Sequence, residues 1–327
     1  MSTIISVVMP CFNGAKYIKT AVDSIINQTM RDWELIVVDD ASTDNTTAIL
    51  ESITDTRIKI LRRSVNRGYP VAMNAGIEHA IGKYIARMDV DDFSMPARLE
   101  EQLKAIELFP DASFCGLNRF RITPGNKMYA DRNMPTRKYI YETWKDLMDK
   151  RRLFTDPSVL IEKEKVMTVG GYRTFQRSGM DVDLWLRVME KFGPCITITT
   201  LLFGKRMEPC SLIFNPQTSL INQIPRILAR QRAERPSDDV QDGKDIDVEE
   251  YKKSGWMKAG NKNERAGLLI GSLVTCLWFC DWKGVKVYYK QMKLVSDLTM
   301  VHIIFEVTKK IIQRLKNNPF VRYNPPV

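Results

Sequence analysis

The alternation of strand-like and helix-like segments over the first hundred residues constrains the fold of this chain most. The strand-like runs are "IISVVMP", "WELIVVDD", "IKILR" and "KYIARMD"; the first is a continuous apolar run and the second is expected to be a second buried strand, as in parallel sheets. Between them, residues 15–27, 44–53 and 69–82 have apolar side chains at helical spacing, with Asp44 as the expected N-cap of the second helix and Gly82 closing the third. The pattern predicts an α/β fold with a mainly parallel, Rossmann-like sheet flanked by helices.

The pattern is looser after residue 100. We expect strands over 112–123 and 156–163, a hairpin or bent strand over 195–208, and helices over 138–150, 180–193 and 221–232. The acidic run 234–250 has eight acids against two bases, which is typical of a solvated linker. These patterns predict a catalytic α/β domain over residues 1–215 and a helical extension over 216–327 that contains this linker.

Two features of the C-terminal extension bear on whether the chain spans a membrane or binds a membrane surface. Its longest apolar stretch, 266–280, has 15 residues, whereas a membrane span needs roughly 20, so we expect a buried helix there. Residues 283–322 hold nine Lys or Arg and two acids, and end in a basic amphipathic helix. This helix fits an anionic membrane surface, or it docks on the domain with its basic face in water. The first ten residues lack the pattern of a signal peptide.

Composition narrows the classes of partner. The net charge of +10 favours anionic partners such as nucleotides and phospholipid head groups. The basic residues form no recognised nucleic-acid-binding module, so nucleic acid is not an expected partner. A histidine metal site is not expected, because the chain has only two histidines. No two of the six cysteines form a CxxC pair, which indicates reduced thiols and a cytoplasmic location.

Acidic residues follow two of the predicted strands. Asp89, Asp91 and Asp92 come directly after "YIARM", and Asp39 and Asp40 end "WELIVVDD". Ligands of parallel sheets bind beyond the carboxyl ends of the strands, so both groups are expected to line one site. An oxygen-only cluster suits a hard cation such as Mg²⁺ or Mn²⁺. The alternatives are an acidic turn that caps the next helix, and a helix cap beside a solvated acid.

Four stretches in order resemble the motifs of family-two glycosyltransferases. They are "ISVVMPCFNG", "INQTMRDWELIVVDDASTDNT", "NRGYPVAMNAGIEHAIGKYIARMDVDDFSMPARLEEQ" and "GGYR…MDVDLWLRV". The likeness runs from about Ile4 to Gly193, and the ordered set is far more specific than any single motif. The resemblance implies the GT-A, or nucleotide-diphosphosugar transferase, fold.

The resemblance also implies a reaction and its donor site. It implies inverting transfer of one sugar from a UDP-sugar to a glycan or lipid-linked acceptor in polysaccharide biosynthesis. A divalent cation, Mn²⁺ or Mg²⁺, would stabilise the diphosphate leaving group. The residues that would bind the nucleotide sugar are Pro10, Phe12, Asn13, Asp39, Asp40, Arg67, Asp89 and Asp91. The metal would be held by Asp91 and Asp92.

On the acceptor side, the resemblance assigns a catalytic base. Asp181 matches the family's base position in "GMDVDLW", although Met180 stands where an acid usually precedes it, and Asp183 is a second candidate. Asp156 replaces a usual histidine, and Asp156 and Trp185 are expected on the acceptor side, with Trp185 packing or stacking on a sugar. These two departures leave a rival interpretation, a non-catalytic nucleotide-sugar-binding or scaffold protein. The expected location of the enzyme is the cytoplasm or the inner face of the cell membrane.

Overall fold

The computed structural model describes residues 4–131, 134–149, 153–175, 178–207, 223–244, 306–313 and 320–323, and short runs of one to three residues between 273 and 288. The chain forms two compact units. The first comprises residues 1–119, 135–204 and 232–234, and the second comprises 120–134, 205–231 and 235–327. The predicted boundary near residue 215 lies outside the described residues and stays a prediction.

The first half of unit 1 alternates strands and helices as predicted. The elements are β1 (Ile5–Cys11), α1 (Ile18–Ile26), β2 (Trp33–Asp39), α2 (Thr46–Glu51), β3 (Ile58–Arg62), α3 (Tyr69–His79) and β4 (Tyr84–Arg87). All four strands are parallel, in the order β3-β2-β1-β4. Every residue of β1 and β2 is buried, including the polar Ser6, Glu34 and Asp39 among their apolar side chains.

The sheet continues with shorter strands of mixed direction. These elements are α4 (Arg98–Leu108), β6 (Cys115–Leu117), β9 (Tyr139–Glu142), α5 (Trp144–Met148), the 3₁₀ turn η1 (Asp156–Ser158), β10 (Leu160–Glu162), α6 (Lys163–Thr168), α7 (Met180–Phe192) and β11 (Cys195–Ile198). The full order of the sheet is β3-β2-β1-β4-β10-β6-β11-β9, and β10 is antiparallel to both of its neighbours. The prediction of an α/β fold with a mainly parallel sheet is therefore confirmed.

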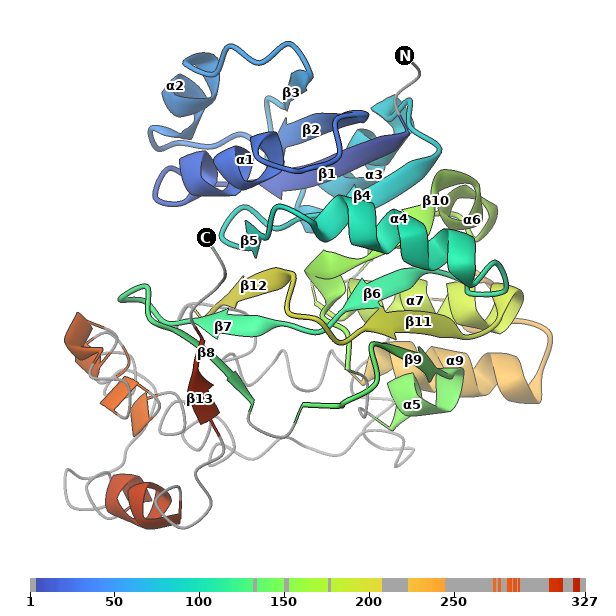
Figure 1. Ribbon diagram of the computed structural model, residues 1–327. Helices are drawn as coiled ribbons and strands as arrows, with labels where there is room; N and C mark the ends of the chain where they lie inside the picture. Colours follow the sequence, from blue (N-terminus) through green and yellow to red (C-terminus); the bar gives the residue numbers. More distant parts are fainter. Residues whose placement is uncertain are drawn as a thin grey trace. The chain divides into compact units, whose positions relative to one another are not determined.

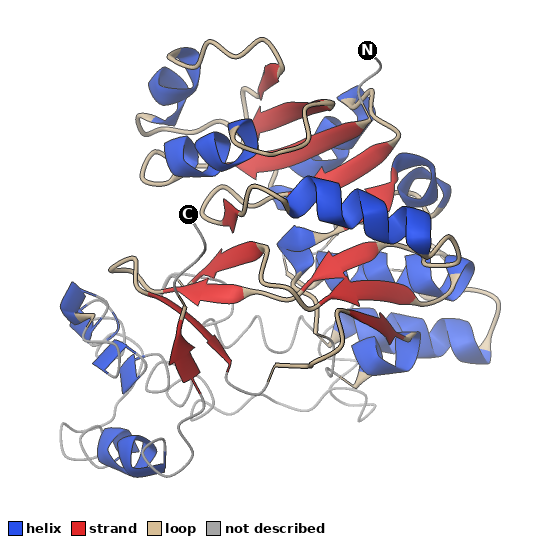
Figure 2. Cartoon of the chain, in the orientation of Figure 1, coloured by secondary structure: helices blue, strands red, loops and turns tan. Residues whose placement is uncertain are grey.

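Helices cover both faces of this sheet. Figures 1 and 2 show α4 in front of the strands and α3 and α7 behind them. The close approach of α3 depends on Gly76, because a Cβ atom there would lie 2.4 Å from Val8 Cγ1 and 3.1 Å from Val38 Cγ2. Burying one such valine contributes about 1.5–3 kcal/mol to the free energy of folding, so this contact anchors α3 on the sheet.

Four predicted elements differ from the structure. The strand expected over 112–123 divides into β6 and β7 (Phe120–Ile122), which belong to different sheets, and only residues 160–162 of the strand expected over 156–163 form a strand. The segment 138–150 was expected to be one helix, but it divides into β9 and α5 at Thr143, whose side chain forms a capping box with Asp146. The segment 195–208 is not a hairpin, because β11 joins the large sheet whereas β12 (Phe203–Arg206) pairs with β5 (Phe93–Ser94). Residues 199–202 separate the two strands, so the segment is neither a hairpin nor one bent strand.

Unit 2 contains β7 (Phe120–Ile122), β8 (Met128–Asp131), α9 (Ile224–Glu234, whose last residues belong to unit 1) and β13 (Phe320–Arg322). β8 lies between β7 and β13 and is antiparallel to both. Of the predicted apolar helix over 266–280, the described residues Leu273, Val274, Cys276 and Leu277 are helical and the first three are buried, whereas most of the basic tail lies outside the described residues. Within the described part of the chain, no helix is both long and apolar enough to cross a bilayer.

Candidate active site

The site lies at the carboxyl ends of three adjacent strands of unit 1. The register pairs Cys11 of β1 with Asp39 of β2 and Val8 of β1 with Arg87 of β4. Because these strands are parallel, the loops that follow them meet at one edge of the sheet. The predicted convergence of the acidic strand ends therefore follows from the topology.

Asn13 connects the loops after β1 and β2. Its backbone has φ of 53°, in the left-handed region that asparagine tolerates. Its side-chain oxygen accepts hydrogen bonds from the Thr43 N–H (2.8 Å) and hydroxyl (3.2 Å), and its own N–H donates to Ser42 Oγ at 2.9 Å. The neighbouring Phe12 side chain is 48% exposed, an unusual position for a large apolar group. A rigid loop therefore presents an aromatic ring at the edge of the site.

The side chains of Asp39 and Asp40 are buried and hold loops of the site in place. Asp39 accepts hydrogen bonds from the Ser42 N–H at 3.0 Å and the Thr47 hydroxyl at 3.0 Å. Asp40 accepts from the backbone N–H groups of Arg67 and Gly68, at 2.8–3.2 Å. Arg67 itself is exposed and Pro10 is buried. A nucleotide would therefore meet loops that these carboxylates organise.

Asp44 does not cap α2 as expected. The N-cap of α2 is Asn45, and Asp44 precedes it. One carboxylate oxygen of Asp44 accepts from the N–H of Thr46, and the other accepts from the N–H of Ala15 at 3.1 Å. Burial opposes the charge of Asp44, but the Thr46 hydroxyl and these N–H groups outweigh it and hold the pKa of Asp44 below its ordinary value. Asp44 thus ties the loop after β1 to the start of α2 instead of only capping the helix.

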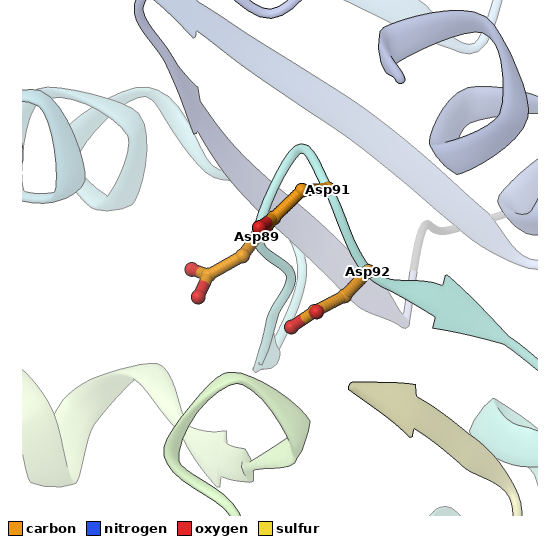
Figure 3. Close-up of side chains that lie close together, drawn as sticks. All are labelled: Asp89, Asp91 and Asp92. Carbon is orange, nitrogen blue, oxygen red and sulfur yellow. The ribbon is translucent and has the colours of Figure 1, made fainter. Parts of the chain in front are cut away.

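Asp89, Asp91 and Asp92 form a cluster in the turn between β4 and β5. One carboxylate oxygen of each lies within 4.8 Å of the other two, and Figure 3 shows the three side chains around this turn. The turn is closed by the Asp92 N–H, which donates to the Asp89 carbonyl at 3.2 Å. Three carboxylates without nitrogen or sulfur ligands fit a hard divalent cation that also binds phosphate oxygens. The donor set therefore suits Mg²⁺ or Mn²⁺.

A buried arginine connects this turn to helix α7. Arg87, 4% exposed, places Nη2 at 3.3 Å from both Asp89 Oδ1 and Asp181 Oδ2. Its Nε donates to the Tyr69 hydroxyl, which donates to Asp89 Oδ1 at 3.0 Å. Burial opposes the charge of Arg87, but the carboxylates of Asp181 and Asp89 outweigh it and hold its pKa well above the ordinary value. The Arg87 guanidinium thus contacts both Asp89, on the expected donor side, and Asp181, the predicted base.

Asp181 and Asp183 have different environments at the start of α7. The Asp181 side chain is 15% exposed, whereas that of Asp183 is completely buried. Asp183 pairs with Arg187 Nη2 at 2.7 Å and with Arg173 Nη1 at 3.3 Å. A carboxylate enclosed by two arginines is poorly placed to accept a proton from a substrate. The geometry therefore favours Asp181 over Asp183 as a base.

Asp156, in η1, contacts Trp185 of α7. The indole N–H of Trp185 donates to Asp156 Oδ1 at 3.2 Å. Trp185 is 1% exposed and its ring packs on Phe114, with centroids 5.1 Å apart. Burial excludes the expected alternative of sugar stacking in this conformation, so Trp185 orients Asp156 instead. Asp156 and Asp181 both act electrostatically on the buried Tyr172.

Comparison with known proteins identifies the family. The sequence model described as "Glycosyl transferase family 2" matches residues 6–178, which is more than half of the chain. The chain belongs to glycosyltransferase family 2. The segment that this model matches includes β1 to β4 and the aspartate cluster.

Proteins similar to this family 2 glycosyltransferase are described as glycosyltransferases themselves. The protein named as glycosyltransferase EpsE in Bacillus subtilis is 32% identical over 192 residues, which cover 57% of this chain and 67% of EpsE. The Escherichia coli enzyme "UDP-Glc:alpha-D-GlcNAc-diphosphoundecaprenol beta-1,3-glucosyltransferase WfgD" is 36% identical over 100 residues, or 31% of this chain and 40% of WfgD. The solved structure of S. aureus TarS 1–349 in complex with UDP superposes with a TM-score of 0.54 at 17% identity, over 68% of this chain and 65% of that one. This likeness shows the shared GT-A fold.

The sequence interpretation of this glycosyltransferase overlooked Arg87, Tyr69 and Tyr172. A signal for Arg87 was present, because a charged residue inside the strand "YIAR" whose every residue is buried requires a buried partner. No comparable signal marks the two tyrosines, whose rings meet edge to face with centroids 6.4 Å apart. Their position depends on contacts between α3 and the segment before α7.

Proposed function

We propose that this protein is an inverting, metal-dependent glycosyltransferase that moves a single sugar from a UDP-sugar to a glycan or lipid-linked acceptor. The observation that carries the proposal is the arrangement of Asp89, Asp91 and Asp92 at the end of β4 opposite Asp181 at the start of α7, with Arg87 between them. A leaving-group side and a base on separate elements are what an inverting displacement requires, because the nucleophile and the leaving group occupy opposite faces of the sugar.

The donor side would bind the nucleotide. The loop Pro10–Asn13 offers the exposed Phe12 ring, and Asp39 and Asp40 hold the adjoining loops. Arg67 is exposed beside them and would approach the nucleotide. The UDP complex of TarS, which shares the fold, supports a uridine nucleotide, as does the UDP-Glc in the name of WfgD.

The metal would be held by Asp91 and Asp92, with Asp89 contacting the ribose or the sugar. When bound, the cation supplies positive charge to the diphosphate leaving group. The turn that presents the three carboxylates brings them within reach of one ion. Without a cation they raise one another's electrostatic energy, which is the physical argument for metal dependence.

Asp181 would accept the proton of the attacking hydroxyl. Its position is fixed by α7, whose apolar residues on the sheet side, including Leu184 and Val188, are fully buried. Asp156 would contact the acceptor, since the indole N–H of Trp185 orients its carboxylate. The acceptor named in WfgD, a sugar on diphosphoundecaprenol, supports a lipid-linked acceptor here, in polysaccharide biosynthesis at the cytoplasmic face of a membrane.

The test is a transfer assay with a panel of UDP-sugars, Mn²⁺ or Mg²⁺, and diphosphoundecaprenol-linked sugars as acceptors. We expect transfer of one sugar, with the product anomer opposite to that of the donor by NMR. A product of retained configuration would refute the inverting mechanism. Binding of UDP without turnover across the panel would favour the rival, a non-catalytic nucleotide-sugar-binding protein.

A further inference from the structure

Arg87 uses its hydrogen-bond donors differently from the other buried arginines near the site. Arg98 is completely buried and donates from all three guanidinium nitrogens. Its partners are neutral groups, including the carbonyls of Arg87 and Pro157, and burial lowers its pKa to about 9. These bonds join β4 to η1, so the role of Arg98 is structural.

Arg187 provides a second comparison, because it lies on the same helix as Asp181. It pairs with the buried Asp183 and donates to the carbonyls of Val169 and Gly171. Its contacts therefore join α7 to the segment after α6. None of these partners of Arg187 is one of the proposed site residues Asp89, Asp181 or Asp156.

The guanidinium of Arg87 lies between two carboxylates of the proposed site. Nη2 is 3.3 Å from the oxygens of both Asp89 and Asp181, and Nε is held by Tyr69. Nη1 is buried and has no hydrogen-bond partner among the described residues. A buried N–H group without an acceptor costs about 1–3 kcal/mol, a cost that a purely structural arginine avoids. Burying Arg87 therefore has an unfavourable free energy that burying Arg98 does not have.

We propose that Arg87 is a positioning residue that ties the base Asp181 to the donor-binding Asp89. The inference rests on the proposed function. Arg87 holds Asp181 as an oriented carboxylate, so the base is placed by the same group that contacts the donor side. Tyr69 fixes the guanidinium in turn, since its hydroxyl bridges Nε and Asp89.

Lysine is the informative replacement, because it keeps the charge. A single ammonium cannot reproduce the spread of the guanidinium nitrogens between Tyr69 and the two carboxylates. Arg87→Lys should therefore leave Asp181 charged but displaced. Displacements of about 1 Å cost catalytic rates up to about 10²-fold, so we expect kcat to fall about 10–100-fold and the donor KM to stay within about threefold.

The experiment is a double-mutant cycle on the full-length protein. Transfer rates are measured for wild type, Arg87→Lys, Asp181→Asn and the double variant, with radiolabelled donor to reach low rates. If Arg87 acts through Asp181, its replacement costs less than about threefold once Asp181 is Asn. Losses that multiply in the double variant would overturn the inference.

Arg187→Lys is the matched control, a buried arginine in an ion pair on the same helix. It should lower the melting temperature with kcat within about twofold of wild type at a temperature where both are folded. A loss in kcat equal to that of Arg87→Lys would show that loosening α7 is sufficient, and would overturn the inference. If transfer by Asp181→Asn is too slow to detect, the role of Arg87 is tested in two other ways. One is the comparison of Arg87→Lys with Arg187→Lys, and the other is whether Arg87→Lys changes kcat or the donor KM. A wild type without transfer would instead refute the proposed function, whereas multiplicative losses in an active protein would refute only the role of Arg87.

Discussion

Replacing Asp181 and Asp183 separately should produce two different kinds of defect, although the residues are two positions apart. Asp181→Asn keeps the size of the side chain but cannot accept a proton. General-base catalysis is worth about 10²–10⁴ in rate, and at 1.36 kcal/mol for each factor of ten this is about 2.7–5.4 kcal/mol of activation free energy. We expect a loss of transfer in that range with nearly unchanged affinity for UDP.

Asp183→Asn should instead unfold the protein more easily. Its carboxylate is 0% exposed and pairs with Arg187 at 2.7 Å, so the substitution leaves a buried arginine without its counter-charge. Breaking a buried pair in this way costs about 3–5 kcal/mol. For a unit of 150–250 residues each kcal/mol shifts the melting temperature by about 2–4 °C, which gives a decrease of about 6–20 °C.

The assay measures initial transfer rates at a temperature well below both melting points, and thermal unfolding by circular dichroism. Donor affinity is measured by calorimetry with UDP and Mn²⁺. The reasoning is refuted if Asp183→Asn abolishes transfer in a folded protein while Asp181→Asn retains it. If both variants transfer at the wild-type rate, the base lies elsewhere, with Asp156 the next candidate.

Further predictions concern the metal, the tail and acid stability. Asp91→Asn should weaken binding of the nucleotide sugar in Mn²⁺ without changing the melting temperature, and equal UDP affinity of the wild type in EDTA and in Mn²⁺ would contradict the metal site. Truncation near residue 296 should release the protein from anionic liposomes while sparing donor hydrolysis. Flotation that is the same for both forms at physiological salt would leave only the docked-helix interpretation. Burial opposes the charge of Glu34, but bonds from Lys59, Ser6 and the Ile81 N–H outweigh it and lower its pKa below the ordinary value of 4.5. A lowered pKa in the folded state stabilises the protein above pH 4.5, and this contribution is lost as the pH falls through the folded-state pKa. Glu34→Gln should therefore flatten the fall in the free energy of unfolding below about pH 5 in urea titrations, and parallel curves for the two proteins would rule this out.

The amino-acid sequence determined the parallel half of the sheet and its acidic edge. β1 and β2 are apolar at almost every position, and such continuous runs are typical of strands buried on both faces. Asp39 ends β2 and Asp40 follows it, and the other three aspartates follow β4, so the strand assignment also placed them at one edge. Chain order was sufficient because both inferences depend on neighbours along the chain.

The tertiary structure decided which carboxylates of the candidate site stay partly exposed and which are enclosed by arginines. In the sequence, Asp181 and Asp183 differ only by their position in "MDVDLW", but one faces Arg87 and the other is enclosed by Arg173 and Arg187. The same holds for the split of residues 195–208 between two sheets. Burial and ion pairing depend on segments far apart in the chain, and periodicity within one segment carries no information about which distant segment packs against it.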